Sequence, residues 1–443
     1  MRIGTSYRAL WAISLPVILA EVSEAVIEVV DTIFLAHYGL VELAAIGLAD
    51  AIYAVAMFAT LGLVDGIQIV IARREGQGRP REVGKAFNQG LYLLTATSLA
   101  IIAILWFASS LITGLVIRSP EVGKAVDDFL GIFVFSMLFH GPNLALSAFY
   151  IGISRTRVLV GATVILAAVN IVLDYGLIFG NLGLPEMGMR GAAIASLAAE
   201  IAAFLYLVLH AVARGHARRY GLFRFGRWNR GMARLLTRIS YPVALDSLAE
   251  TGRWFAFFLI IEQLGEMALA GASVVHLCYM LLTIPVGGFA EAVVSLVSKL
   301  VGRGEYVEIG PLIRRALAVS YVVTVPILAG IVLAPEAVLA LFTPDRELIA
   351  ASADSMRVIA LAVAVMIPGE IVGSALAGTG DTPATLVIEM ILTSTVLAYT
   401  FVTALSLAQP LAVVWTGEIL GWILCLALSW AWLRSGRWKR VVV

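Results

Sequence analysis

The sequence consists largely of long apolar segments, separated by short stretches that contain Gly, Pro and charged residues. About 20 apolar residues are needed for a helix to cross the hydrocarbon layer of a membrane, where every backbone polar group must be bonded within the protein. Twelve segments qualify: 9–36, 44–72, 86–117, 124–150, 157–181, 189–213, 236–261, 268–298, 312–342, 348–378, 384–407 and 411–433. Only 14% of the residues are charged, against about 25% in soluble domains. The sequence therefore predicts an all-α polytopic membrane protein with twelve transmembrane helices.

The chain matches itself at a constant offset of 226 residues, through loops as well as apolar segments. The aligned pairs include Ile13-Ser14-x-Pro16 with Ile239-Ser240-x-Pro242, Glu24 with Glu250, Gly76-x-Gly78 with Gly302-x-Gly304, Asp128 with Asp354, and Thr156 with Thr382. A single register that survives loops indicates duplication rather than shared hydrophobicity. Each repeat holds six spans, so both halves insert with the same orientation, as in transporters with parallel repeats and a midplane cleft between the halves.

The predicted domains are an N-terminal lobe at 1–213, a basic linker at 214–235 and a C-terminal lobe at 236–443. The linker region carries a run of arginines with no acidic residue between them: Arg214, Arg218, Arg219, Arg224, Arg227, Arg230, Arg234 and Arg238. The opposite face has only Arg118, Lys124, Arg190 and Arg346. Because cytoplasmic loops carry the excess of Lys and Arg, we expect an inner or plasma membrane protein with cytoplasmic termini and linker. The run is interpreted as a topology signal on a solvated connector, with lipid or partner recognition as the alternative.

Ionisable residues inside a membrane are costly and by default indicate function. Glu21, Glu24, Glu28 and Asp31 lie within an arc of roughly 80° on the first predicted helix, which we take to be retained rather than cleaved as a signal peptide. Four carboxylates on one stripe cannot all be ionised cheaply, so the stripe is predicted to bind protons or cations. The alternative is pairing with basic residues of neighbouring helices.

A candidate cation site lies near the outer ends of the first, fifth and sixth spans. Asn170 and Asp174 share a face at i,i+4, and Asp31 and Ser196 are predicted at the same depth. Two carboxylates, an amide and a hydroxyl offer hard oxygen ligands for Na⁺, or a protonatable pair. The alternative is interhelical hydrogen bonding. The residues 226 positions after Asp31, Asn170 and Asp174 are not acidic, so the site is predicted only in the first half.

The second half offers candidate substrate-binding carboxylates at Asp246, Glu250 and Glu370. Glu250 is the repeat mate of Glu24, and the two are expected to flank the cleft between the halves together with Glu21 and Glu28. Carboxylates there suit cationic substrates. Arg253 shares a face with Asp246 and Glu250, so a structural ion pair with either is the alternative interpretation.

The motifs and their order resemble the multidrug and toxic compound extrusion (MATE) family along essentially the whole chain. They are Val30-Asp31-Thr32, Gly39, Leu43-Ala44-Ala45, Gly76-Gln77-Gly78, Asn170-x-x-x-Asp174, Gly188-x-x-Gly191-Ala192-Ala193-x-Ala195-Ser196, Pro242 with Glu250, and Gly378-Thr379-Gly380-Asp381-Thr382. The resemblance is to the branch with an Asp/Asn/Asp first-lobe cation site, which carries over onto Asp31, Asn170 and Asp174, with Ser196 beside them. The family's seventh-helix carboxylate carries over onto Glu250. A tenth-helix carboxylate of one branch falls at Met366, with Glu370 one turn later, and Glu21, Glu24 and Glu28 exceed the family pattern in acidity.

The resemblance implies an Na⁺- or H⁺-coupled antiporter that exports amphipathic cationic compounds. Its expected partners are a drug-like small molecule and the lipid bilayer, with no nucleic acid, no cofactor beyond the coupling ion, and a monomeric state. A flippase for lipid-linked saccharides is the alternative within the broader superfamily, although such proteins usually have a more cationic cavity. Neither a metal-spaced His/Cys/Asp set, a phosphate loop nor a catalytic triad pattern favours a membrane enzyme, and no repeated filter-like loop favours a channel.

Overall fold

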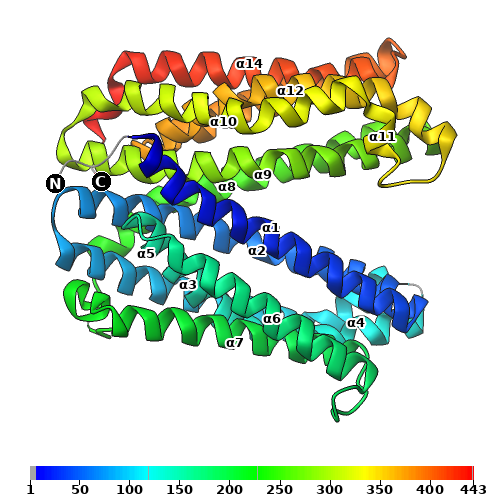
Figure 1. Ribbon diagram of the computed structural model, residues 1–443, viewed down its shortest axis with the longest axis horizontal. Helices are drawn as coiled ribbons and strands as arrows, with labels where there is room; N and C mark the ends of the chain where they lie inside the picture. The colour runs from blue at the N-terminus through cyan, green and yellow to red at the C-terminus, as the bar shows by residue number, and fades with distance from the viewer. Residues whose placement is uncertain (1–5, 118, 227, 442) are drawn as a thin grey trace. The chain divides into compact units, whose positions relative to one another are not determined.

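The computed structural model describes residues 6–117, 119–226, 228–441 and 443. Residues 1–5 of the predicted N-terminal lobe, Arg118 of the predicted outer face and Arg227 of the linker lie outside the described residues. Every regular element in the described ranges is helical, which confirms the all-α prediction (Figure 1). The helices of the first half are α1 Tyr7–Tyr38, α2 Leu40–Gly76, α3 Pro80–Val116, α4 Pro120–Phe133, η1 Val134–Ser136, α5 Met137–Gly152, α6 Arg157–Phe179, α7 Met189–Ala213 and η2 Ala217–Gly221.

The second half repeats this order of long helices. It contains α8 Arg230–Glu262, α9 Glu266–Arg303, η3 Tyr306–Glu308, α10 Ile309–Leu333, α11 Pro335–Leu339, α12 Arg346–Gly378, α13 Thr382–Phe401, η4 Val402–Ser406, α14 Leu411–Ser435 and η5 Arg437–Arg440. Within the described residues, nine spans are both long and apolar enough to cross a membrane. The other three predicted spans are α1, α2 and α8, helices of 32, 37 and 33 residues, which at 1.5 Å per residue exceed a layer of about 30 Å.

Local signals explain several helix ends. Pro80 and Pro120 occupy the first turns of α3 and α4, where the missing N–H of proline costs no hydrogen bond. The Asp345 side chain accepts from the N–H groups of Glu347 and Leu348 at the start of α12, as an N-cap residue should. Gly180 ends α6 at φ 72°, a left-handed conformation that glycine adopts without steric cost.

The contacts divide the chain into two compact units. Leu19–Ser240 forms the first, here called the N-unit, and Tyr241–Val443 with the described part of residues 1–18 forms the second, the C-unit. Both divisions fall inside helices, close to prolines at the same repeat position, Pro16 in α1 and Pro242 in α8. The start of α1 thus packs in the C-unit, where the Trp11 ring lies 5.4 Å from that of Phe289. The domain boundaries predicted from the sequence stay a prediction.

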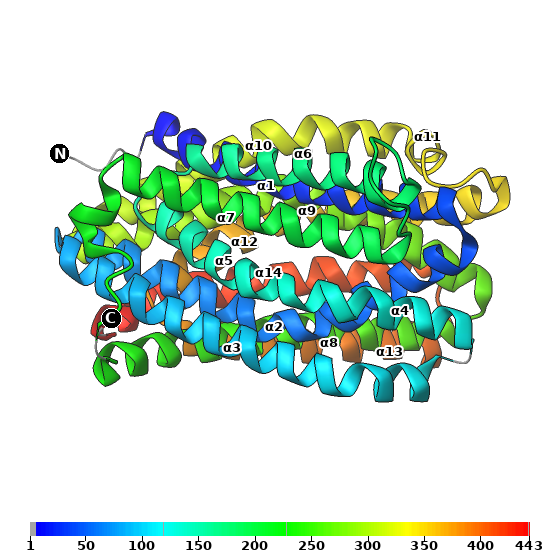
Figure 2. The same ribbon diagram turned by 90° about the horizontal axis from the view of Figure 1, so that it is seen from below.

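In the C-unit, α12 is the central helix. It packs against α9, α10 and α14, and Figure 1 shows it beside α10 and α14, whereas in the view from below other helices largely cover it (Figure 2). Met356, Ile359, Val363 and Ile367 on α12 are all completely buried, so this helix is apolar on the faces that meet its neighbours.

In the N-unit, α7 packs along α6 and also contacts α4 and α5. Its buried residues are almost all small, among them Gly191, Ala195, Ala199 and Ala203. A Cβ at Gly191 would press on the backbone of Leu177 in α6, so glycine permits this close approach. Small residues are what close packing of membrane helices requires, and here they bring the polar residues of α6 and α7 together.

The basic linker differs from the solvated connector that the sequence suggested. Tyr220 and Leu222 are buried, and Asn88 of α3 both donates to the Gly221 carbonyl at 2.9 Å and accepts from the Phe223 N–H at 2.9 Å. Gly84 leaves room for the backbone of Tyr220. The linker backbone is therefore bound to α3, and the arginine side chains remain exposed at Arg214, Arg218, Arg219 and Arg224.

Candidate functional site

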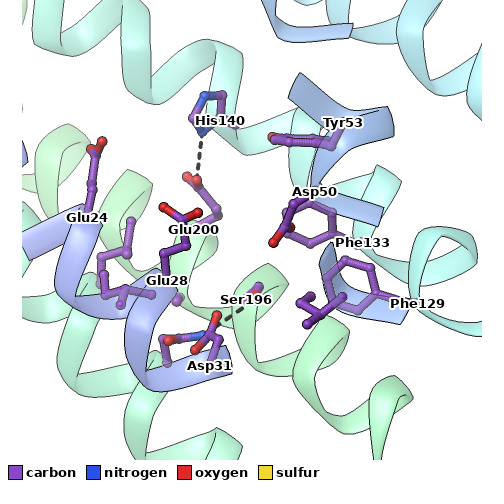
Figure 3. Close-up of a pocket in the computed structure, with 15 residues that line it drawn as sticks. Glu24, Glu28, Asp31, Asp50, Tyr53, Phe129, Phe133, His140, Ser196 and Glu200 are labelled. Carbon is purple, nitrogen blue, oxygen red and sulfur yellow. Dashed lines mark hydrogen bonds and ion pairs between the residues drawn. The ribbon is translucent and has the colours of Figure 1, made fainter. Parts of the chain in front are cut away.

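A cavity of about 270 Å³ lies within the N-unit, among α1, α2, α4, α5, α6 and α7 (Figure 3). The side chains around it are of two kinds, carboxylates with a few other polar groups, and aromatic or aliphatic residues. They are Glu24, Ile27, Glu28, Asp31, Ile46, Asp50, Tyr53, Phe129, Phe133, His140, Leu166, Asn170, Ser196, Ala199 and Glu200. The volume is many times the 10–15 Å³ that one water needs, so the cavity has room for more than a bare ion.

Three of the four residues that the sequence predicted as a cation site line this cavity, and the fourth, Asp174, lies next to the Asp31 carboxyl group. Asn170 and Asp174 on α6 are buried, with 1% and 0% of their surfaces exposed. The Asn170 side-chain amide donates to the Ser196 hydroxyl on α7 at 3.4 Å. The carboxyl groups of Asp31 on α1 and Asp174 are neighbours that act directly on each other. The structure thus brings the four side chains together, and their role stays a prediction.

Several oxygens of this site lack donors. No hydrogen-bond donor among the described residues reaches Asp31 Oδ1, Asn170 Oδ1 or either carboxylate oxygen of Asp174. A buried acceptor without a partner is costly, and a buried charge without one is costlier still. No ion pair to Asp31 or Asp174 occurs within the described part of the chain, so basic neighbours do not neutralise them. A shared proton or a small hard cation satisfies these oxygens.

This arrangement differs from a transition-metal site. Within the ranges that the structure describes, no group of three or more His, Cys, Asp or Glu side chains is placed to hold a metal ion. The donors here are two carboxylates, one amide and one hydroxyl. Oxygen-only donors with a low charge count suit a weakly held, exchangeable hard cation rather than Zn²⁺ or copper.

A second polar group occupies another part of the same cavity. His140 Nδ1 on α5 lies 2.8 Å from Glu200 Oε1 on α7, and the Asn143 amide donates to Glu200 Oε2 at 2.6 Å. Figure 3 shows the His140–Glu200 pair facing the same space as Glu24 and Asp50. The position of Glu200, four residues after Ser196, puts both side chains on one face of α7.

Asp50 of α2 was missed by sequence reasoning. It lines the cavity beside Tyr53, and the available signal was a carboxylate inside the apolar segment 44–72. Tyr53, Phe133 and Phe129 form the aromatic wall, with ring centroids 4.7 Å apart for Tyr53–Phe133 and 4.8 Å for Phe129–Phe133. Aromatic faces next to carboxylates suit a cation with an apolar body.

The remaining predicted residues lie elsewhere. Glu21 is on α1 but is not part of the cavity lining, whereas Asp246 and Glu250 on α8 and Glu370 on α12 belong to the C-unit, where they influence one another electrostatically. That Glu24 and Glu250 flank a shared cleft stays a prediction.

Arg253 pairs with neither of the carboxylates that the sequence offered. Its Nη1 donates to Glu418 on α14, and both side chains are 3% exposed. The partner is 165 residues away in sequence, so a pattern on one helix face could not identify it. At the position equivalent to Asp31, Phe257 is buried against Trp415, with ring centroids 4.7 Å apart.

Twelve membrane-spanning segments among the described residues, in two repeated halves, with an acidic cavity among the helices of one half, define a membrane transporter. The family comparison finds the same internal repeat. The MatE family model matches residues 16–176 and again 242–402, so its two matches begin 226 residues apart. The chain belongs to the MatE family, a family of transporters and not of enzymes, which sets aside the membrane-enzyme alternative.

Curated relatives are similar to this chain over two thirds of its length or more. The probable multidrug resistance protein NorM of Thermotoga maritima is 25% identical over 434 residues, covering 97% of this chain and 93% of that protein. The probable multidrug resistance protein NorM of Brucella suis is 27% identical over 296 residues, covering 66% of this chain and 62% of that protein.

Solved structures share the fold. A crystal structure of a MATE protein in complex with MaL6 has a TM-score of 0.88 at 18% identity, covering 97% of this chain and 96% of that one. A MOP-superfamily transporter of Pyrococcus furiosus, in which reversed polarity of the binding pocket suggests a different function, has a TM-score of 0.88 at 19% identity, covering 98% and 97%. At these identities the likeness concerns the fold.

Proposed function

We propose that this transporter is an antiporter that exports amphipathic cationic organic compounds by alternating access, in exchange for inward Na⁺ or H⁺. It would act as a monomer in the inner or plasma membrane, with its termini and linker in the cytoplasm and with no organic cofactor. The observation that carries the proposal is the set of buried oxygens without hydrogen-bond donors, on Asp31 and Asn170, which line the cavity, and on Asp174 next to Asp31.

The cation part of the proposal rests on charge balance. Two neighbouring carboxylates in a medium of low dielectric repel each other when both are ionised, so the pair binds a proton or a cation when it can. A bound proton or cation attracts both carboxylates, Asp31 of α1 and Asp174 of α6, and its release restores their mutual repulsion. A cation arriving from one side of the membrane therefore changes the relation of these two helices, as a coupling ion must.

The substrate part rests on the rest of the cavity. Glu24, Glu28 and Asp50 supply negative charge, and Tyr53 and Phe133 supply apolar and aromatic contact surface. Relatives named as probable multidrug resistance proteins support a drug-like substrate. The saccharide-lipid flippase is less well supported, because His140 is the only basic side chain among the described residues that line this cavity, and a phosphate-bearing lipid would meet mainly carboxylates there.

The first test uses purified protein in proteoliposomes with ethidium, a permanently charged aromatic cation. Na⁺ and pH gradients are imposed separately. We expect uphill ethidium transport with at least one of them, and expect Asp31→Asn and Asp174→Asn each to abolish it, because neither variant retains the paired carboxylates.

The matched control is Thr400→Val. Thr400 is the repeat mate of Asp174, is likewise 0% exposed, and lies in the half without the acidic pair, so the variant should retain coupled transport. Uphill transport that persists in both Asn variants contradicts the cation site. Gradient-independent movement of a saccharide lipid, without ethidium flux, supports the flippase instead.

A further inference from the structure

The cavity contains a second ionisable centre that the cation site does not use. Ser196 and Glu200 lie one helical turn apart on α7, about 6 Å along the axis at 1.5 Å per residue. Glu200 pairs with His140, whereas the Asp31–Asp174 pair has no basic partner among the described residues. The two centres therefore share one cavity but differ in chemistry.

Glu200 is held firmly, and His140 is the partner that can change its charge. One carboxylate oxygen accepts from the Asn143 amide at 2.6 Å, and the same amide contacts the Glu200 carbonyl at 3.0 Å. The other oxygen faces His140 Nδ1 at 2.8 Å. With Nδ1 engaged, Nε2 is the second position at which the imidazole gains or loses a proton. Asn143 is a constant donor, and His140 is either neutral or cationic.

The pair is accessible from the cavity. The side chains of His140 and Glu200 are 26% and 16% exposed, and both line the cavity. The other charged or titratable groups that face them are Glu24 from α1 and Tyr53 from α2, with Asp50 and Glu28 farther along the lining. Since all of these are acidic, a proton on His140 is the only positive charge that a lining side chain in the described residues brings to the cavity.

We propose that the His140–Glu200 pair is a proton–substrate exchange centre, at which a proton on His140 and the cationic group of the exported compound compete for Glu200. When His140 Nε2 takes a proton, the imidazolium neutralises Glu200 and repels a second cation. When that proton leaves, Glu200 presents a full negative charge to an organic cation. One proton bound thus corresponds to one positive charge released, with no bond made or broken other than the N–H bond.

This inference deepens the proposed function and depends on its cationic substrate. It also separates the roles of the two centres. Asp31 and Asp174 would bind the coupling Na⁺ or H⁺, and His140 would make substrate affinity fall with acidity. A purely structural pair that only links α5 to α7 would not give substrate affinity any pH dependence of its own.

The test measures ethidium affinity from pH 5.5 to 8.5 in Na⁺-free detergent solution, where the dye keeps its charge. In the Asp31→Asn/Asp174→Asn background the other titrating pair is gone. We expect the remaining affinity to weaken with acidification by up to tenfold per pH unit, the limit for one competing proton. Adding His140→Gln should reduce this slope to the smaller contribution of the other lining carboxylates. Adding Glu200→Gln instead should reduce the slope in the same way and weaken binding at pH 8.5 by roughly tenfold, the effect of one lost charged contact.

The matched control is His276→Gln in the same background. His276 packs against Trp254, with ring centroids 4.2 Å apart, and lies in the other half of the chain, so the slope should persist. An unchanged slope after His140→Gln overturns the proposal. A second readout works in the wild type: the imidazole C–H signals of the five histidines in NMR spectra. The His140 signal should titrate and shift on ethidium addition, and a His140 signal insensitive to ethidium overturns the proposal even where the variants fail to fold.

Different outcomes contradict the proposed function and the exchange centre. Wild-type protein that does not bind ethidium at any pH contradicts the cationic substrate of the proposed function. Wild-type protein that binds ethidium and exports it uphill, but whose Asp31→Asn/Asp174→Asn variant binds it with the same affinity at pH 5.5 and 8.5, contradicts only the exchange centre.

Discussion

The buried ion pair between Arg253 and Glu418 gives the sharpest prediction about stability. Both side chains are 3% exposed and directly hydrogen bonded, and the Arg253 guanidinium also lies 4.8 Å from the centre of the Trp254 ring. Glu418→Gln removes one charge and leaves the guanidinium buried without its counter-charge. The perturbation therefore exposes the full desolvation cost of Arg253, which the pair otherwise offsets.

The expected magnitude follows from the burial. Two unit charges about 4 Å apart interact by about 4 kcal/mol at an effective dielectric of 20, and removing one partner of a buried pair typically costs about 3–5 kcal/mol. For a cooperative unit of roughly 200 residues, each kcal/mol lowers Tm by about 2–4 °C. We therefore expect Glu418→Gln to lower the Tm of the detergent-solubilised protein by about 6–20 °C.

The assay is thermal unfolding followed by size-exclusion chromatography, with two comparison variants. Glu262→Gln removes an exposed carboxylate at the end of the same helix as Arg253, and its effect should stay within about 0.5 kcal/mol. Arg253→Met/Glu418→Leu replaces both charges with apolar groups and should recover most of the loss, because the cost comes from the orphaned charge. A Glu418→Gln variant as stable as Glu262→Gln would refute the reasoning, as would a double variant less stable than the single one.

Two further predictions concern the bound linker. Asn88→Ala should lower the free energy of linker binding to α3 by about 1–3 kcal/mol, because it leaves the Gly221 carbonyl and the Phe223 N–H without their partner, and trypsin should then cleave the linker arginines faster. Tyr92→Phe is the milder comparison, because it removes only an exposed hydrogen bond to Gly226. Equal cleavage in both variants would contradict the role of Asn88. Burial, followed by the neighbouring positive groups of His210, Arg155, Arg219 and Arg214, lowers the pKa of His216 below its ordinary value of 6.5. The bound linker thus takes up fewer protons than the released one, so the stability of the bound state is complete above about pH 6.5 and decreases as pH falls through that value. A fluorophore attached at Arg224→Cys, in a protein without its other cysteines, should report release of the linker on acidification. The same protein with His216→Gln should show no release on acidification.

The sequence by itself determined the class of fold and half of the site. Apolar segments of membrane-spanning length identify helices because lipid allows no unsatisfied backbone, and the offset of 226 residues identifies the duplication because it is read directly from residue identities. The relation between Asn170 and Asp174 was also available, since an i,i+4 spacing fixes a common helix face whatever the helix packs against. Likewise, the stripe from Glu21 to Asp31 follows from helix geometry alone.

The tertiary structure decided which partners meet across helices. His140 and Glu200 are 60 residues apart, and Arg253 and Glu418 are 165 residues apart. Neither distance carries a periodic signal, because contacts between helices depend on how their surfaces pack and not on spacing along one helix. The sequence therefore offered only carboxylates of the same helix as partners of Arg253, whereas helix packing pairs it with Glu418 of α14. The same packing, made close by the small residues of α7, brings carboxylates from separate helices to one cavity, where they form two chemically different groups.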